Sequence, residues 1–265
     1  MDKDNITLQE SHVRNMLKTK YIGRDFYFFE ETTSTFDAAD GIDIKNGSVI
    51  CARKQTNGRG RLGRSWKSEK GGIYFSVILM PDFEFDKVQI MTALCAVGIR
   101  RALSLFLPCS IKWPNDIVSK DGKKICGILT KLKFTHEGKP IVNIGIGINA
   151  NTKEFDDELK YASSISLITG KDIDENFALC KVLEEIEKCT SFENLSETIK
   201  EYKKECVTLG KRVRVLYATG GESVTGLCES VEDDGSLTVK TDDGRLLNVN
   251  SGEVSVRGIY GENYV

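Results

Sequence analysis

The most informative segment of this chain is Gly58-Arg59-Gly60-Arg61-Leu62-Gly63-Arg64-Ser65-Trp66. Three glycines within six positions are incompatible with a stable helix or a central strand. Glycine lets backbone N–H groups approach a ligand closely, and the arginines between the glycines offer bidentate donors for phosphate or carboxylate. We therefore expect an anion-binding loop that is mobile when empty and ordered by its ligand.

The distribution of charge indicates that the anionic ligand is small. Seven basic residues and one acid lie between Arg53 and Lys70, whereas the whole chain has 37 basic and 39 acidic residues. The positive field is thus confined to one short segment of an otherwise acidic protein. A nucleic-acid surface needs basic residues over a wider face, so no nucleic-acid partner is expected. The structural alternative is a solvated basic turn without a ligand.

Two nucleotide-binding patterns fit parts of the chain but fail on context. Gly58 to Ser65 is one substitution from a P-loop, yet Arg64 replaces its lysine, and a strand follows where a P-loop needs a helix. The segment 145–150 fits a loose dinucleotide pattern, but its glycines alternate with isoleucines inside a strand. The glycine face of that strand admits either a ligand or a packed helix.

Helical and strand periodicities predict a mixed α/β (α+β) fold. We expect strands at 25–29, 48–54, 72–80, 110–113, 123–133 and 140–148, and helices at 7–19, 86–106, 174–189 and 192–206. A capping pattern from Thr7 to Glu10 marks the first helix, and Asp121-Gly122 marks a hairpin turn. The face of the longest helix that should pack on the sheet carries Val88, Met91, Cys95, Ala102 and Leu105.

The sequence changes in character after Leu209-Gly210. Short β-branched runs at 212–217, 223–231, 236–240 and 245–249 are separated by Gly and Asp. Strands and turns at this spacing predict a small β-barrel. We therefore divide the chain into a main domain at 1–207 and a C-terminal barrel domain at 208–265.

Length and composition predict a folded protein that is not secreted. The 265 residues are 40% hydrophobic and 29% charged, which suits a sizeable core and argues against disorder. Apolar runs are shorter than the ~20 residues of a membrane helix, and no signal peptide is recognisable, so a cytoplasmic location is expected. The eight cysteines form no Cys-x-x-Cys pair and are accompanied by two histidines. We expect buried, reduced thiols and no zinc site.

Two further segments carry candidate site residues. Lys112-Trp113-Pro114-Asn115-Asp116 ends a strand with an amide and a carboxylate at the turn. The segment 123–129 begins a strand with Lys123 and Lys124. Taken alone, ordinary turn chemistry explains Asn115 and Asp116 as well as a function does, and a solvated lysine is the simpler interpretation of Lys124.

In combination these segments resemble the catalytic domain of biotin protein ligases. The resemblance extends over about residues 30 to 265, and the Gly-Arg-Gly-Arg-x-Gly-Arg-x-Trp run at 58–66 is its most specific part. The segments 112–116, 124–129 and 145–149 follow in the family's order, and 252–258 resembles the close of its C-terminal domain. The resemblance implies a mixed-sheet biotin/lipoate ligase-like domain followed by an SH3-like small β-barrel.

The resemblance also implies a two-step reaction. Biotin and MgATP give biotinyl-5′-AMP and pyrophosphate, and a specific lysine of a biotin carboxyl carrier protein then takes the biotinyl group. The implied cofactors are ATP and Mg²⁺, with biotin as substrate and the magnesium ligands unknown. The acyl phosphate hydrolyses readily, so a loop that closes over it has a purpose.

Site residues are assigned at the positions that match the family's motifs. The implied contacts of biotin are Ser34, Thr35, Gln55, Arg59, Gly60, Arg61 and Lys124. Those of ATP and the adenylate are Arg59, Arg61, Arg64, Trp66, Asn115, Lys124 and Asn149. In catalysis, Arg61 and Lys124 would offset the charge that develops as a carboxylate attacks phosphate, and Asp116 would help to deprotonate the acceptor lysine.

The chain departs from the family pattern in two places. Phe36 occupies a position that is often Asn, so no polar role is assigned there. Many members carry an N-terminal helix-turn-helix domain, whereas about two dozen residues precede the first catalytic strand here. We therefore expect a ligase without repressor function. Exposed strand edges would allow a homodimer.

Two alternative functions belong to other classes. A lipoate ligase would adenylate lipoate or another acyl acid instead of biotin, although the basic loop argues against it. A non-catalytic binding module would use the barrel to hold a protein or nucleic-acid partner. Such a module would show no ATP-dependent gain in biotin retention.

Overall fold

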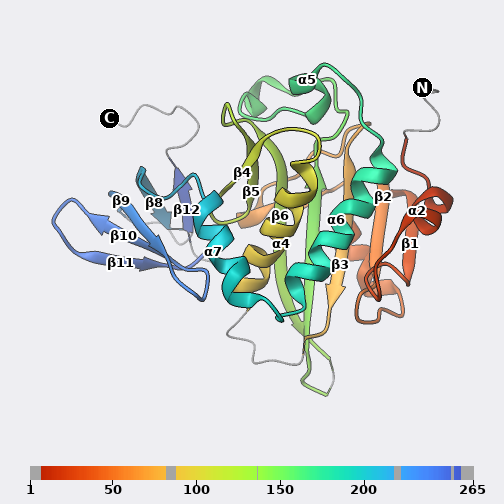
Figure 1. Cartoon of the computed structure of the whole chain (residues 1–265), viewed down its shortest axis with the longest axis horizontal. Coiled ribbons are helices and arrows are strands. Elements are labelled where there is room, and N and C mark those ends of the chain that lie inside the picture. Colours follow the sequence, from red (N-terminus) through yellow and green to blue (C-terminus); the bar gives the residue numbers. More distant parts are fainter. Residues whose placement is uncertain (1–6, 82–87, 136, 218–221, 252–253, 258–265) are drawn as a thin grey trace.

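The computed structural model describes residues 7–81, 88–135, 137–217, 222–251 and 254–257. A seven-stranded mixed sheet forms the centre of the molecule, and a five-stranded antiparallel sheet lies at one end (Figure 1). This architecture confirms the predicted mixed α/β fold with a small C-terminal barrel.

The larger sheet has the spatial strand order β1-β2-β3-β7-β6-β5-β4. Its strands are β1 (Phe26–Thr32), β2 (Val49–Gln55), β3 (Ile73–Leu79), β4 (Cys109–Lys112), β5 (Asp116–Ser119), β6 (Lys124–Phe134) and β7 (Pro140–Ile148). Strands β1 and β2 are parallel, and the other neighbours are antiparallel. The sequence predicted each of these strands except β5, which has only four residues and precedes the hairpin turn at Asp121-Gly122.

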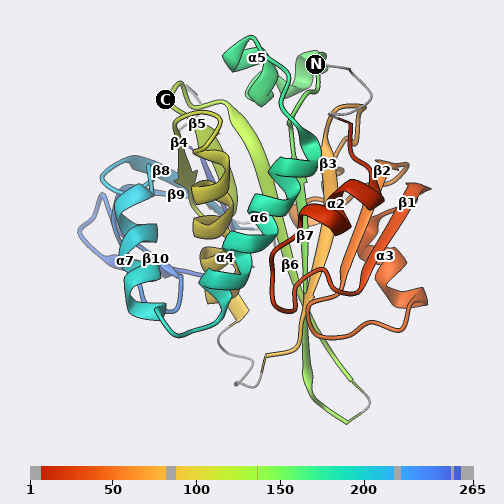
Figure 2. The ribbon, with the colours of Figure 1, turned by 45° about the vertical axis from the view of Figure 1, so that its right-hand side comes forward.

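Two long helices cross one face of this sheet. They are α4 (Val88–Leu103) and α6 (Glu175–Thr190), flanked by α2 (Glu10–Met16) and α7 (Leu195–Glu205) (Figure 2). Two short helices, α3 (Thr35–Ala38) and α5 (Ile165–Thr169), were not predicted. On α4, Met91, Cys95 and Ala102 are buried as predicted, and the side chain of Val88 lies outside the described residues. Leu105 is 62% exposed because α4 ends at Leu103.

The capping pattern predicted at Thr7 is wrong. Helix α2 begins at Glu10, and its N-cap residue Gln9 makes no side-chain capping bond. Instead, the backbone N–H of Leu8 donates to a carboxylate oxygen of Glu175 on α6 at 3.0 Å. A tertiary contact therefore fixes this segment, and a local pattern could not predict it.

Alternation along β7 separates the core from the functional face. Ile144, Ile146 and Ile148 are buried in the main apolar cluster, which also contains residues of α4 and α6. Burial of this apolar surface is the main driving force for the fold. Gly145 and Gly147 point to the opposite face and line a cavity.

The C-terminal sheet has the order β11-β10-β9-β8-β12. Its strands are β8 (Arg212–Tyr217), β9 (Val224–Val231), β10 (Leu237–Thr241), β11 (Leu246–Val249) and β12 (Val254–Arg257). The sequence predicted the first four, and β12 adds a fifth within the predicted 252–258 motif, of which residues 252–253 and 258 lie outside the described residues. The buried Trp113 Nε1 donates to the Gly235 carbonyl at 3.0 Å, so this sheet contacts the turn between β4 and β5.

All eight cysteines are free and buried, as predicted. Burial raises the pKa of the Cys189 thiol to about 11, and that of Cys180 and Cys228 to about 12. Thiols with such pKa values carry little reactive thiolate at neutral pH. Among the described helices, none has the length and apolar character to cross a membrane.

Candidate active site

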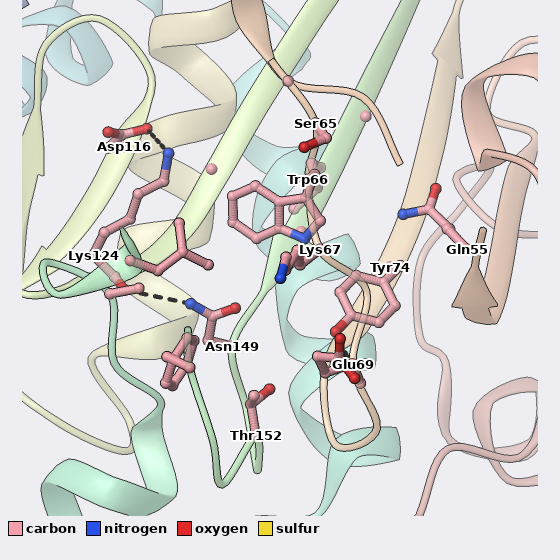
Figure 3. Close-up of a pocket in the computed structure, with 18 of the residues that line it drawn as sticks. Gln55, Ser65, Trp66, Lys67, Glu69, Tyr74, Asp116, Lys124, Asn149 and Thr152 are labelled. Atoms are coloured by element: carbon pink, nitrogen blue, oxygen red, sulfur yellow. Dashed lines mark hydrogen bonds and ion pairs between the residues drawn. The ribbon is translucent and has the colours of Figure 1, made fainter. Parts of the chain in front are cut away.

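A cavity of about 1100 Å³ lies on the glycine face of the larger sheet (Figure 3). Every site residue assigned from the sequence lines it, namely Ser34, Thr35, Gln55, Arg59, Gly60, Arg61, Arg64, Trp66, Asn115, Asp116, Lys124 and Asn149. These residues belong to segments far apart in the sequence, so the fold brings them together. A large concave site with convergent polar groups is the expected form of a small-molecule site.

The basic loop forms a narrow hairpin along the wall of the cavity. Arg59 and Ser65 pair as an isolated antiparallel bridge, and Leu62 at the tip has a positive φ of 55°. A Cβ atom on Gly58 would lie 2.4 Å from the Trp66 carbonyl oxygen, so only glycine fits there. Strand β3 follows the loop, which confirms that the segment is not a P-loop.

Polar contacts attach this hairpin to other parts of the fold. Arg61 Nη1 donates to Asn115 Oδ1 at 3.0 Å, and Arg61 Nη2 donates to the Ser251 carbonyl of the C-terminal segment. Arg59 forms an ion pair with Asp37 of α3 at 2.8 Å. Burial lowers the pKa of the Arg61 guanidinium, although arginine stays charged at neutral pH. The cavity therefore has a fixed, partly desolvated positive charge in its wall.

The Trp66 indole covers part of the glycine face. A Cβ atom on Gly147 would lie 2.4 Å from Trp66 Cε2, and one on Gly127 would lie 2.7 Å from Cζ3. The Lys124 ammonium is 5.2 Å from the ring centroid, within cation–π range (Figure 3). In the part of the chain that the structure describes, the buried Trp66 Nε1 has no hydrogen-bond acceptor. A buried donor of this kind needs a water or a ligand as acceptor.

Phe36 covers the adjoining part of the same face. A Cβ atom on Gly145 would lie 2.7 Å from Phe36 Cδ2, and Phe36 is only 4% exposed. The two glycines of β7 therefore have different roles. Gly145 accommodates a residue of the packed helix α3, whereas Gly147 accommodates the Trp66 ring in the wall of the cavity.

Lys124 and Asp116 form an ion pair within the cavity (Figure 3). The distance from Nζ to Oδ1 is 2.7 Å, and the side chains are 27% and 13% exposed. The backbone N–H of Lys124 donates to the Tyr161 carbonyl at 2.7 Å, which fixes the start of β6. The lysine is thus paired and partly buried, unlike the solvated side chain that its own segment suggests.

Two amide side chains stand close to this pair. Asn115 Nδ2 donates to the Ile128 carbonyl at 2.8 Å, and Asn149 Nδ2 donates to the Lys124 carbonyl at 3.4 Å. The first amide precedes β5 and the second follows β7. Their positions are fixed by neighbouring strands, which suits groups that orient a ligand.

A cluster of uncharged polar groups lies where β2 and α3 meet. Gln55 Oε1 accepts from the Thr35 backbone N–H at 2.9 Å, and Gln55 Nε2 donates to Ser68 Oγ at 2.7 Å. Ser76 Oγ donates to Thr35 Oγ1 at 2.9 Å, and Ser34 caps α3. This cluster offers both donors and acceptors without net charge.

Sequence reasoning missed several residues of the cavity. Tyr74, Asn151, Thr152 and Glu175 also line it. Burial raises the pKa of both Tyr74 and Glu175. The predicted strand at 72–80 could have indicated Tyr74 as a wall residue. Nothing in the sequence distinguishes Glu175 from the other acids of its helix.

Comparison with known proteins places this fold and site in one class. Residues 26–151 match the model of the biotin/lipoate A/B protein ligase family, and residues 208–257 match the biotin protein ligase C-terminal domain. The chain is 34% identical over 247 residues to the bifunctional ligase/repressor BirA of Bacillus subtilis, covering 89% of this chain and 76% of that protein. It is 30% identical over 228 residues to the biotin–[acetyl-CoA-carboxylase] ligase of Mycobacterium tuberculosis, covering 82% and 81%.

A solved structure agrees with these relatives. The Aquifex aeolicus biotin protein ligase in complex with biotin and ATP superposes with a TM-score of 0.76 and 32% identity, covering 88% of this chain and 99% of that one. The fold and the site thus define an enzyme of the biotin/lipoate ligase class. Within that class, the chain belongs to the biotin protein ligase family, as its motifs predict. The alternative of a non-catalytic binding module is thereby set aside.

Proposed function

We propose that this enzyme activates biotin as biotinyl-5′-AMP and transfers the biotinyl group to a specific lysine of a biotin carboxyl carrier protein. The observation that carries the proposal is the Lys124–Asp116 pair beside Trp66, in a cavity that collects every motif residue. The Aquifex relative binds biotin and ATP, which supports the same pair of substrates here.

We propose that the biotin ring binds at the uncharged polar cluster where β2 and α3 meet. Ser34, Thr35 and Gln55 offer donors and acceptors that suit a neutral urea group. Ser34 and Thr35 are 2% and 3% exposed. An acyl acid whose ring cannot hydrogen-bond to these buried groups would bind poorly. This end of the cavity would therefore distinguish biotin from other acids.

The cationic wall is the proposed place of adenylation. A biotin carboxylate oxygen attacks the α-phosphorus of ATP, a new P–O bond forms, and pyrophosphate leaves with the electrons of the broken bond. Arg59, Arg61 and Lys124 would lie along the carboxylate and phosphate, and Gly60 would let the loop backbone approach them, while its own N–H donates to the Arg64 carbonyl at 2.7 Å. Fixed donors at such a place stabilise the charge of the transition state more than they stabilise the ground state.

Magnesium would enter with the nucleotide. The cavity lining includes carboxylates such as Asp116 and Glu69, which fits an ion held by one or two protein oxygens together with substrate phosphates. Bound there, Mg²⁺ would neutralise phosphate charge. Within the described residues, no cluster of three or more potential metal ligands is present.

The adenylate would be held by aromatic and amide groups. Trp66 offers a flat ring and a donor, while Asn115 and Asn149 offer amide side chains in the same cavity. Arg64 would contact the phosphates from the loop. In the second step the acceptor amine loses a proton, with Asp116 as the proposed partner, and attacks the acyl carbon. An amide bond forms and AMP leaves.

The remaining predictions concern organisation. We propose a catalytic domain at 1–207 and a barrel domain at 208–265, which the separate family matches support. The lack of repressor function, a homodimer and a cytoplasmic location stay predictions. Binding to operator DNA and sedimentation velocity are the measurements for the first two.

The decisive assay supplies biotin, MgATP and a purified carrier domain. We expect pyrophosphate release with biotin and MgATP in the absence of the carrier. When the carrier is added, we expect a mass increase on one of its lysines. Adenylation of lipoate without reaction of biotin would instead place the enzyme with the lipoate ligases. Absence of any acyl-dependent pyrophosphate release would overturn the proposal.

A further inference from the structure

Glu175 is a buried carboxylate that the proposed mechanism does not use. It lies in the first turn of α6, is 5% exposed, and lines the cavity. Its Oε2 accepts from the Leu8 backbone N–H at 3.0 Å, and its Oε1 accepts from Asn151 Nδ2 at 3.1 Å. A buried carboxylate is costly unless it is fully hydrogen-bonded, so both contacts are needed.

The contact to Asn151 leads from Glu175 to the turn at Gly71, which connects the basic loop to β3. Asn151 Nδ2 also donates to the Ile173 carbonyl, and Asn151 Oδ1 accepts from the Ile173 N–H, both at 2.9 Å. The backbone N–H of Asn151 donates to the Gly71 carbonyl at 2.5 Å. Gly71 has a φ of +89°, and a Cβ atom on it would lie 2.7 Å from the Asn151 carbonyl carbon. The Gly71 turn, which follows the basic loop, therefore packs directly on the Asn151 backbone.

We propose that Glu175 is a positioning residue for the nucleotide end of the cavity, acting through Asn151 on the Gly71 turn and on the loop that carries Trp66. This inference rests on the proposed function. It assigns a role to the N-terminal segment as well, because Leu8 supplies the other hydrogen bond of the carboxylate. Asn149, two residues before Asn151, belongs to the same wall of the cavity.

Glu175→Gln tests the proposal with little change in volume. A glutamine has one acceptor oxygen, so it cannot accept from both Leu8 and Asn151, and its NH₂ group would face a donor. Rotation of the Asn151 amide would not repair the site, because its oxygen already accepts from Ile173. One of the two contacts must therefore be lost.

The chain provides a matched control on the same helix. Glu187 of α6 also accepts from backbone N–H groups of the N-terminal segment, at Lys20, Tyr21 and Ile22, at distances between 2.7 and 2.9 Å. Glu187 is not among the described residues that line the cavity. Both Glu175→Gln and Glu187→Gln alter hydrogen bonds to the N-terminal segment. Only Glu175→Gln should raise the KM for ATP.

We expect Glu175→Gln to raise the KM for ATP about tenfold while the KM for biotin stays within about twofold, because small displacements of positioning groups cost up to about 100-fold. Asn151→Ala should behave similarly, and the double variant should show little further loss. Backbone amides of residues 66–74 should exchange faster with deuterium in Glu175→Gln than in Glu187→Gln.

Equal KM values for ATP and equal exchange rates in Glu187→Gln, Glu175→Gln and Asn151→Ala would overturn this role for Glu175. The exchange measurement needs no substrate, so it separates the two proposals. A wild-type protein that forms no adenylate, but whose loop exchange depends on Glu175, would refute the proposed function and leave the mechanical coupling intact.

Discussion

The indole of Trp66 lies directly on the backbone of Gly147. A Cβ atom at position 147 would come within 2.4 Å of Trp66 Cε2 and 2.6 Å of Nε1, closer than real Cβ contacts allow. The glycine of β7 is thus required by a side chain from the basic loop, some eighty residues earlier in the chain. Sheet and loop are complementary surfaces of one wall.

Gly147→Ala should therefore displace the Trp66 ring. We expect the bound adenylate to dissociate about tenfold faster, because misplaced contact groups cost up to about 100-fold. Rapid filtration of the enzyme with radiolabelled adenylate, which separates bound from free label, measures this rate. Gly41→Ala is the control, since a Cβ atom at Gly41 would meet nothing within 4 Å. If both variants retained the adenylate equally, the role of the ring would be refuted.

Lys124→Ala should slow adenylation by on the order of 100-fold or more, as the loss of one preorganised charge-stabilising donor does elsewhere. Single-turnover pyrophosphate release gives the rate without interference from the transfer step. Lys123→Ala is the matched control, because the side chain of the neighbouring Lys123 donates to the Lys160 carbonyl at 2.8 Å and Lys123 is not among the described residues that line the cavity. Adenylation at nearly the wild-type rate would remove Lys124 from the mechanism.

Arg61→Ala should speed the loss of bound adenylate by about tenfold or more, since a charge-assisted hydrogen bond contributes about 1.5–3 kcal/mol. The melting temperature should change by only a few degrees, because the loop contributes little to the core. Arg245→Ala, which removes an exposed ion pair with Asp243 in the turn between β10 and β11, serves as the control. An unchanged adenylate half-life would contradict the expectation.

The stability of the enzyme should depend on pH through Glu175. Burial raises the pKa of this carboxyl above its ordinary value of 4.5. The folded state then binds the proton more tightly than the unfolded state, so the contribution is most favourable below pH 4.5 and is lost as the pH rises through the folded pKa. Urea titrations at a series of pH values should show this. Between pH 4.5 and the folded pKa, the free energy of unfolding of the wild type should fall relative to that of Glu175→Gln. A constant difference would disprove the linkage.

The eight buried cysteines should resist labelling in the native protein. Their raised pKa values leave little thiolate, and burial hinders the approach of a reagent. In buffer, we expect Ellman's reagent to react rapidly with less than about one thiol per protein molecule. In guanidinium chloride it should react with all eight. Rapid native labelling of several thiols would show that the core opens readily.

Much of the site could be predicted because each part of it is continuous in the sequence. The run from Gly58 to Trp66 combines glycines that need close packing with arginines that need an anion, and both signals are local. The glycine alternation in β7 likewise indicated a face open to a large neighbour. Only the fold reveals that Trp66 and Phe36 are those neighbours.

The parts that could not be predicted depend on contacts between distant segments. Strand β5 is too short to show a period of its own and exists because β4 and β6 pair with it. The N-terminal segment is held by Glu175 and Asn176 and not by a capping residue. Leu105 follows the helical period but lies past the end of α4, where the chain has already turned away.

The buried indole of Trp113 has a wider consequence. It is 1% exposed, its backbone N–H donates to Thr208 Oγ1 at 3.0 Å, and its ring nitrogen donates to the Gly235 carbonyl. The tryptophan inside the Lys-Trp-Pro-Asn-Asp motif is therefore hydrogen-bonded to residues that follow position 207. A chain cut after residue 207 would lose both hydrogen-bond partners of this side chain and backbone, two residues from Asn115 and three from Asp116. We therefore expect the C-terminal segment to support the shape of the cavity at this turn.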